Sequence, residues 1–322
     1  METIFITGAC GFIGNAILRS LADRNCRVLA MSRNAEQDSV LRAHGAVAVR
    51  CDLDSVELHH LSSVTTIIYA AGAVGPKYSA AQFKHINSSL TIRLFQLAAA
   101  AGVKQFIYLS SDVVVLSEKD QPSVDETAPY SKLDHPYVQS KIAAEKFLVE
   151  KAGELNIQTI CLRPRLVWGP GDKLQLPLMA KAVESGKFRW IDGGKCLTSA
   201  TFIGNLCHAV LLCIGNVNIP SGAYFIADAE VHTQKFFWQH LLATKQLRGS
   251  EKSIPKWMAF TAARTIKTLY TFFTPSSMVP ITPFSVAVFG TTFTVSCKKA
   301  LDAFGYKSKY SFEQGLATMK ND

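Results

Sequence analysis

The stretch Thr7–Gly14, which reads TGACGFIG, decides the fold of this chain. It follows a short apolar run, Ile4–Ile6, and it opens a segment whose apolar residues Ile13, Ile17 and Leu21 recur at helical spacing. A glycine turn counts as a dinucleotide fingerprint only when a strand precedes it and a helix follows. Both are present, so the stretch predicts a dinucleotide-binding turn rather than a glycine turn without a ligand.

The three glycines of this stretch have different tasks in such a turn. Gly8 lets the chain turn where a side chain would clash, and Gly11 lets backbone N–H groups approach a pyrophosphate at the positive end of the helix. Gly14 lets helix and strand pack closely. The turn residues that we expect to line the cofactor are Gly8, Cys10, Gly11, Phe12, Ile13 and Gly14.

Composition narrows the class of protein. The chain has 322 residues, 48% of them hydrophobic, which is enough for a folded core and argues against disorder. The formal net charge is +9, but lysine and arginine are scattered without a basic block. We therefore expect solubility and a nucleotide phosphate site to explain the charge, with an anionic membrane as a weaker alternative and no nucleic-acid partner.

Cysteine and histidine give no sign of metal or disulfide chemistry. The eight cysteines contain no C-x-x-C pair and the eight histidines show no metal spacing, so we expect no metal and a reducing, cytoplasmic location. The first strand begins at once, so no signal peptide is expected. No window of about 18 residues lacks charge, and a membrane span is not expected either.

Further strands and helices alternate along the first half of the chain. This alternation predicts an α/β fold with a Rossmann-type doubly wound parallel sheet, in which ligands bind beyond the carboxyl ends of the strands. The predicted strands are 27–33, 46–50, 65–70 and 105–109, and the longest predicted helices are 80–101 and 136–152.

The residues after the second and third predicted strands bear on the cofactor. Ser32 and Arg33 stand where an acidic residue would bind the ribose of NAD, and a hydroxyl with a guanidinium suits a 2′-phosphate, so NADP is favoured over NAD. Asp52 could accept the adenine amino group or cap the run that follows, and the sequence leaves both open. The small residues Ala70–Gly72 leave space for ribose and pyrophosphate.

Tyr137 and Lys141 are candidates for the catalytic chemistry. They lie four residues apart and so share a helix face. A free tyrosine titrates near ~10, and a neighbouring positive charge favours the phenolate that exchanges a proton with an alcohol or ketone. Ser111, at the end of the strand 105–109, can bond the reacting oxygen.

At these residues the chain resembles the extended short-chain dehydrogenase/reductase family. The matching stretches are TGACGFIG (7–14), DLD (52–54), AAG (70–72), Asn87, YLSSD (108–112), YVQSK (137–141) and LRPRLVWGPGD (162–172). The resemblance implies that Ser111, Tyr137 and Lys141 carry the chemistry and that Arg163 and Pro164 pass near the nicotinamide. In one departure, the wholly apolar Val113–Leu116 follows the serine where the family often has Tyr-Gly.

The resemblance also extends the expected cofactor site and predicts the assembly. Outside the turn, the residues expected to line the cofactor are Ser32, Arg33, Asp52, Leu53, Ala70, Ala71, Gly72, Asn87, Ser110, Tyr137, Lys141 and Pro164. The helices 80–101 and 136–152 resemble the pair that forms a dimer interface in this family, which implies a homodimer. Burial of the same helices within one chain is the alternative that the sequence leaves open.

The second half of the chain bears on the substrate. Nucleotide-sugar members of the family hold a diphosphate with two arginines, but Thr198–Ser199 and TTFTVSCKKA (291–300) stand at those places. The segments LTSATFIGNLCHA (197–209) and FTVSCKKALDAFGY (293–306) instead resemble the 3β-hydroxysteroid dehydrogenase branch. We expect a dinucleotide-binding domain over 1–165 with a return segment near 201–228, and a substrate-binding region over 166–322.

The aromatic segment 254–274 has three interpretations that the sequence leaves open. It can be a core-facing amphipathic helix, a lid over an apolar substrate, or a helix on a membrane surface with Arg264 and Lys267 toward lipid head groups. The favoured function is an NAD(P)-dependent oxidoreductase that interconverts a secondary alcohol and a ketone on a largely apolar, sterol-like small molecule. The alternatives are a nucleotide-sugar epimerase or dehydratase with bound NAD, and a dinucleotide-sensing protein without catalysis.

Overall fold

The computed structural model describes residues 1–186, 188–273 and 281–319. Its centre is a seven-stranded sheet in the order β12-β7-β5-β4-β1-β2-β3, in which every neighbouring pair is parallel. The strands are β1 (Glu2–Thr7), β2 (Cys26–Ser32), β3 (Val47–Arg50), β4 (Thr66–Tyr69), β5 (Gln105–Leu109), β7 (Gln158–Pro164) and β12 (Gly222–Ile226). The predicted doubly wound α/β fold is confirmed.

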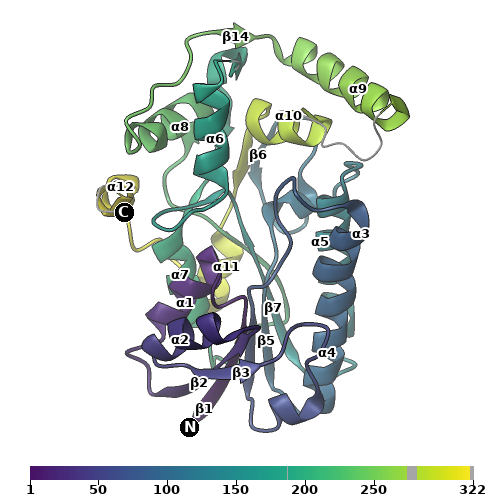
Figure 1. The fold of residues 1–322 in the computed structure, drawn as a ribbon, viewed down its shortest axis with the longest axis vertical. Coiled ribbons are helices and arrows are strands. Elements are labelled where there is room, and N and C mark those ends of the chain that lie inside the picture. The colour runs from purple at the N-terminus through teal and green to yellow at the C-terminus, as the bar shows by residue number, and fades with distance from the viewer. Residues whose placement is uncertain (187, 274–280, 320–322) are drawn as a thin grey trace.

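Helices cover both faces of this sheet (Figure 1). On one face lie α1 (Phe12–Ser20) and α7 (Ile203–Cys213), and on the other α4 (Leu90–Ala100) and α5 (Pro136–Lys151). Strand β1 shows how one short strand contributes side chains to the cores on both faces of the sheet. Ile4 and Ile6 point into the first core cluster and Phe5 into the second, because successive side chains of a strand face opposite ways.

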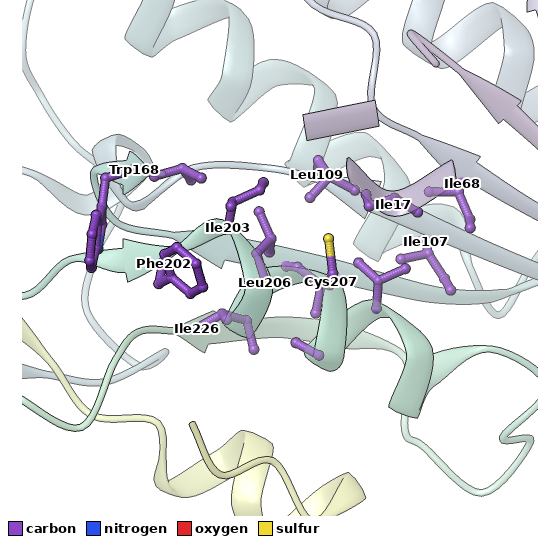
Figure 2. Close-up of a cluster of buried hydrophobic side chains, with 14 of the residues drawn as sticks. Ile17, Ile68, Ile107, Leu109, Trp168, Phe202, Ile203, Leu206, Cys207 and Ile226 are labelled. Atoms are coloured by element: carbon purple, nitrogen blue, oxygen red, sulfur yellow. The ribbon is translucent and has the colours of Figure 1, made fainter. Parts of the chain in front are cut away.

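The first core cluster joins the amino-terminal half of the chain to later segments. Figure 2 shows Ile17 of α1 and Leu206 and Cys207 of α7 among the strand residues Ile68 and Ile107. All five side chains are buried. Burial of a large apolar side chain contributes about 1.5–3 kcal/mol to the free energy of folding. The turn between β1 and α1 is therefore held in place by a well-packed core.

The helix predicted over 80–101 is interrupted. It consists of α3 (Ala80–Phe83), a π-helical segment η2 (Lys84–Ser89) and α4. The π segment contains Asn87, whose side chain is buried and hydrogen-bonded, and such widened turns are frequent at functional sites.

Most of the elements between residues 175 and 290, apart from α7 and β12, lie beyond the carboxyl ends of the parallel strands (Figure 1). A four-stranded sheet has the order β13-β10-β15-β6, and paired short strands β11–β8 and β14–β9 flank it. The remaining helices are α2 (Ala35–Ala43), α6 (Gln175–Glu184), α8 (Gln234–Ala243), α9 (Lys256–Phe273), α10 (Pro283–Gly290), α11 (Lys298–Phe304) and α12 (Phe312–Met319). The remaining strands are β6 (Gln121–Val124), β8 (Val167–Trp168), β9 (Trp190–Ile191), β10 (Leu197–Thr198), β11 (Thr201–Phe202), β13 (His232–Thr233), β14 (Ser253–Ile254) and β15 (Phe293–Val295). Short 3₁₀ turns lie at Leu58–Leu61, Asp112–Val115 and Asp192–Gly194.

Helix α9 packs on the body through one face only. Ala259, Phe260 and Ala263 are buried in a third core cluster, while Trp257 and Leu269 are exposed. The core-facing interpretation therefore holds for one face, and residue 274, at the end of the predicted segment, lies outside the described residues. Across the described part of the chain, no helix combines the length and apolarity that a membrane span requires.

Candidate active site

The glycine turn has the shape that the sequence predicted. Gly8 has φ +68°, and a Cβ on it would lie 2.7 Å from the backbone nitrogen of Ala71 at the end of β4. A Cβ on Gly14 would lie 2.1 Å from the Gly8 carbonyl oxygen. The turn is therefore wedged between β4 and the first turn of α1, with no room for side chains at these two positions.

The amino terminus of α1 suits an anion. Gly11 is its N-cap and offers no side-chain cap, and the first turn of the helix contains no acidic residue. The orphan backbone N–H groups at a helix start, together with the helix dipole, attract phosphate oxygens. These residues fit the pyrophosphate of a dinucleotide. Cys10, Phe12 and Ile13 line the same turn and are not fully buried.

The two residues expected to bind a 2′-phosphate are placed differently. Ser32 is fully buried, and its hydroxyl donates to Asp38 Oδ1 at 2.5 Å, so it is not presented to a ligand. Arg33 is exposed. Burial raises the pKa of Cys10, and the positive charge of Arg33 opposes this rise. Hydrogen bonds from Ser55 lower the pKa of Asp52, and the charge of Arg33 lowers it further. The charge of Arg33 therefore influences both the glycine turn and the loop after β3.

Asp52 caps the loop that follows β3. Its Oδ1 accepts hydrogen bonds from the Ser55 backbone at 2.8 Å, the Ser55 hydroxyl at 2.7 Å and the Asp54 backbone at 3.1 Å. These bonds hold a turn rather than a helix start, because the next helical segment, Leu58–Leu61, has Glu57 as its N-cap. A contact of Asp52 with adenine stays a prediction. The neighbouring Leu53 is buried, and its carbonyl accepts a hydrogen bond from Arg93.

Asn87 fixes the loop after β4. Its Oδ1 accepts from the Ala73 backbone at 2.7 Å, and its Nδ2 donates to the Ala73 carbonyl at 3.0 Å and to the Ser140 hydroxyl at 3.2 Å. These bonds join the π segment, the loop and α5. They hold Ala70–Gly72 against the glycine turn, so Asn87 shapes the site through this loop.

Ser111 and Tyr137 come together as expected. Ser111 follows β5, and its hydroxyl lies close to the Tyr137 phenol. Burial raises the pKa of Tyr137 to about 12, although the neighbouring Ser111 hydroxyl opposes the rise. Ser111 Oγ also donates to Asp112 Oδ1 at 3.0 Å. A phenol and a hydroxyl that lie close together can both hydrogen-bond one substrate oxygen.

Lys141 lies one turn further along α5 and is buried. Its Nζ donates to the Leu109 carbonyl oxygen at 2.7 Å and lies 4.4 Å from the Tyr108 ring centroid. Burial lowers the pKa of Lys141 to about 8, while the negative charge of Glu145 works in the opposite direction.

Glu145 is a residue of the site that the sequence analysis missed. It is fully buried, and its carboxylate accepts hydrogen bonds from Ser110 Oγ at 2.5 Å and from Arg163 Nη2 at 2.6 Å. Arg163 is therefore engaged in a buried ion pair, and its expected position near the nicotinamide stays a prediction. Glu145 lies one helical turn from Lys141, and this spacing is the signal that could have identified Glu145 from the sequence. Pro164 ends β7 beside this pair.

A second buried pair anchors the loop after Ser111. Arg165 Nη1 donates to Asp112 Oδ2 at 2.6 Å, and the Arg165 guanidinium lies 4.8 Å from the Phe293 ring centroid. The apolar residues Val113–Leu116 are buried in the third core cluster. This packing explains why apolar residues follow the serine here.

Aromatic rings surround Tyr137. The Phe83 ring centroid lies 5.7 Å from that of Tyr137, and the Phe284 centroid lies 6.4 Å away. His135 stacks on Phe284 at 4.2 Å, and burial lowers the pKa of His135 to about 4, so this ring is neutral at physiological pH. The surroundings of the phenol are therefore uncharged on this side.

Comparison with known proteins places this arrangement in a family. Residues 4–227 match the NAD dependent epimerase/dehydratase family. The chain is 27% identical over 98% of its length to a 4-hydroxy-2-methyl-3-oxo-4-farnesyl-3,4-dihydroquinoline-1-oxide ketoreductase of Stigmatella aurantiaca, with 95% of that protein covered. It is 25% identical over 97% of its length to sterol-4-alpha-carboxylate 3-dehydrogenase, decarboxylating, of Mus musculus, with 88% of that protein covered.

A solved structure shows the same fold. The UDP-glucuronic acid 4-epimerase from Bacillus cereus in complex with NAD superposes with a TM-score of 0.75 at 17% identity, covering 99% of this chain and 98% of that one. The curated relatives resemble the 3β-hydroxysteroid dehydrogenase branch that the sequence indicated. The chain belongs to the NAD dependent epimerase/dehydratase family and is an NAD(P)-dependent enzyme of the extended short-chain dehydrogenase/reductase type.

Proposed function

We propose that this enzyme interconverts a secondary alcohol and a ketone on a largely apolar, sterol-like substrate. The observation that carries the proposal is the approach of Ser111, at the end of β5, to Tyr137 of α5, with Lys141 one helical turn further along that helix. NAD(P), when bound, supplies or accepts the hydride. The protein's own residues then manage the proton and hold the reacting oxygen.

Tyr137 is the proposed general acid. Because burial raises the pKa of Tyr137 to about 12, the phenol keeps its proton at neutral pH and can donate it to the ketone oxygen. Ser111 donates a hydrogen bond to the same oxygen. In the proposed reaction the positive charge of Lys141, one helical turn further along α5, stabilises the phenolate left after proton transfer.

The proposed preference for an apolar substrate follows from the side chains that surround Tyr137. Phe83 and Phe284 approach Tyr137 from two different segments, and they favour an apolar group beside the carbonyl. At the place where nucleotide-sugar enzymes carry an arginine, Thr198 and Ser199 are buried, and Thr198 Oγ1 donates to the Ser199 carbonyl at 2.9 Å. This packing supports the apolar ketone over the nucleotide-sugar alternative.

The preference for NADP over NAD rests on Arg33. An exposed guanidinium between the glycine turn and Asp52 can form paired hydrogen bonds to a 2′-phosphate.

The assembly and location are also proposals. We propose a cytoplasmic homodimer that uses the outer faces of α4 and α5, which light scattering would test. Peripheral membrane contact would use the exposed Trp257 and Leu269 of α9, because the basic residues of this helix pair with acidic residues of the protein. Co-sedimentation with anionic vesicles would test that contact.

The direct test of the function removes one hydroxyl. Tyr137→Phe should abolish NADPH oxidation in the presence of a steroid 3-ketone or 2-undecanone, while the affinity for NADPH stays within about two-fold, because the ring remains. Tyr310→Phe is the matched control, since its ring packs on Phe202 away from Tyr137. Turnover retained in the Tyr137 variant would overturn the assignment.

A further inference from the structure

A cavity of about 690 Å³ lies between α9, the start of α10 and the loops around residues 117 and 133. Its size falls within the range of small-molecule sites, roughly 300–1,000 Å³. Leu133, Pro283 and Phe284 contribute apolar side chains to its wall. Nothing in the assignment of Ser111, Tyr137 and Lys141 requires this space, so its use needs a separate argument.

Phe284 connects the cavity to the proposed catalytic residues. The same ring lines the cavity, stacks on His135 and lies 6.4 Å between centroids from the Tyr137 ring. A ketone held at Tyr137 would therefore have the cavity on the far side of Phe284. Its substituent on that side would pass along this ring.

The charged side chains at the cavity are largely paired with one another. Arg264 of α9 binds Glu118, and Lys267 binds Asp134 with a separation of 2.6 Å between Nζ and Oδ2. All four residues line the cavity. Lys132 also lines the cavity and is exposed. The two ion pairs hold the other charged groups at the wall, and the aliphatic stems of these side chains add apolar surface to the cavity.

We propose that this cavity binds an extended alkyl or prenyl chain attached to the ketone that Tyr137 reduces. The inference rests on the proposed function for the position of the carbonyl group. Helix α9 forms the outer wall, and its two ion pairs hold it across the cavity. The ligand class is thus an amphiphilic ketone with a flexible apolar tail, whose polar end lies at Tyr137.

Binding of a homologous series tests the tail site without relying on turnover. Calorimetric titration of the protein saturated with oxidised coenzyme, which cannot donate a hydride to a ketone, would use 2-pentanone, 2-heptanone, 2-nonanone and 2-undecanone. Each buried methylene should tighten binding by about four-fold until the cavity is filled. An affinity that does not depend on chain length would overturn the proposal.

A matched pair of variants localises the effect. Thr268 lines the cavity and is exposed on α9, so Thr268→Trp should fill the space without disturbing the core. Ala262 is exposed on the same helix, about 120° around its axis, and Ala262→Trp adds the same ring outside the cavity. Thermal melting would confirm that both variants fold.

The expected result separates the two variants. Thr268→Trp should lose at least ten-fold in affinity for 2-undecanone and keep its affinity for 2-pentanone, while Ala262→Trp matches the wild type. Equal behaviour of the two variants would overturn the tail site. Chain-length-dependent binding without any NADPH oxidation would retain the tail site and reject the proposed reaction, and turnover without chain-length dependence would do the reverse.

Discussion

Lys141 Nζ donates a hydrogen bond of 2.7 Å to the carbonyl oxygen of Leu109, the last residue of β5. This bond ties α5 to the strand end from which Ser110 and Ser111 follow. Burial lowers the pKa of Lys141 to about 8, and the negative charge of Glu145 opposes that shift. The positive charge that the proposed reaction needs is therefore sensitive to moderate alkalinity.

The pH dependence of ketone reduction should report this charge. Lys141 is protonated below its pKa and neutral above it, whereas the pKa of Tyr137, about 12, keeps the phenol protonated throughout this range. We expect kcat/KM to be level near pH 7 and to fall up to tenfold per pH unit above about pH 8. Initial rates between pH 6 and 10 would measure it, and a profile that stays level to pH 10 would reject the role of Lys141.

The ion pair between Glu145 and Arg163 should matter for stability more than an exposed pair. Their side chains are 0% and 4% exposed. Glu145→Ala would leave the guanidinium buried without its partner, at a cost of about 3–5 kcal/mol in the free energy of unfolding. Asp302→Ala breaks the exposed pair with Lys298 and should cost about 0–1 kcal/mol. Urea unfolding of both variants checks the contrast, which equal losses would contradict.

The third glycine of the turn should not accept a methyl group. Gly14→Ala places a Cβ 2.1 Å from the Gly8 carbonyl oxygen, so the turn or the helix must move. We expect a loss of about 1–3 kcal/mol or more in unfolding free energy, together with weaker coenzyme binding. Gly153→Ala is the control, because its Cβ would meet nothing within 4 Å. Wild-type melting and coenzyme affinity in Gly14→Ala would show that the turn tolerates the change.

Local patterns were sufficient for the elements of the sheet and for the positions of Ser111, Tyr137 and Lys141. Strand periodicity and the glycine turn depend on neighbours in the sequence, and the predicted strand 105–109 coincides with β5. The partners of polar side chains were not predictable in this way. Whether Ser32 faces a ligand or Asp38 depends on how α2 packs, and that packing is not encoded in the residues next to the serine.

The same limit explains why the partners of the two buried arginines were not predicted. Arg163 and Glu145 are 18 residues apart, and Arg165 and Asp112 are 53 apart, so neither pair leaves a short-range signature. The basic residues of α9 were assigned to lipid as one alternative because the helix was considered alone. In the folded chain Glu118 and Asp134 approach it from a distant segment and bind Arg264 and Lys267.

Arg33 should decide the choice between the two coenzymes. Arg33→Ala removes the exposed guanidinium that acts on both Cys10 and Asp52, so NADPH should bind about 10–100-fold more weakly while NADH is little affected, because only NADPH carries the 2′-phosphate. Arg27→Ala removes an exposed arginine at the opposite end of β2 and should leave both affinities unchanged. Fluorescence titration of wild type and both variants measures the ratio of the two affinities. Tighter binding of NADH by the wild type, or an equal loss for both coenzymes in Arg33→Ala, would reject 2′-phosphate recognition at Arg33, since a guanidinium that reads this phosphate must discriminate between the coenzymes.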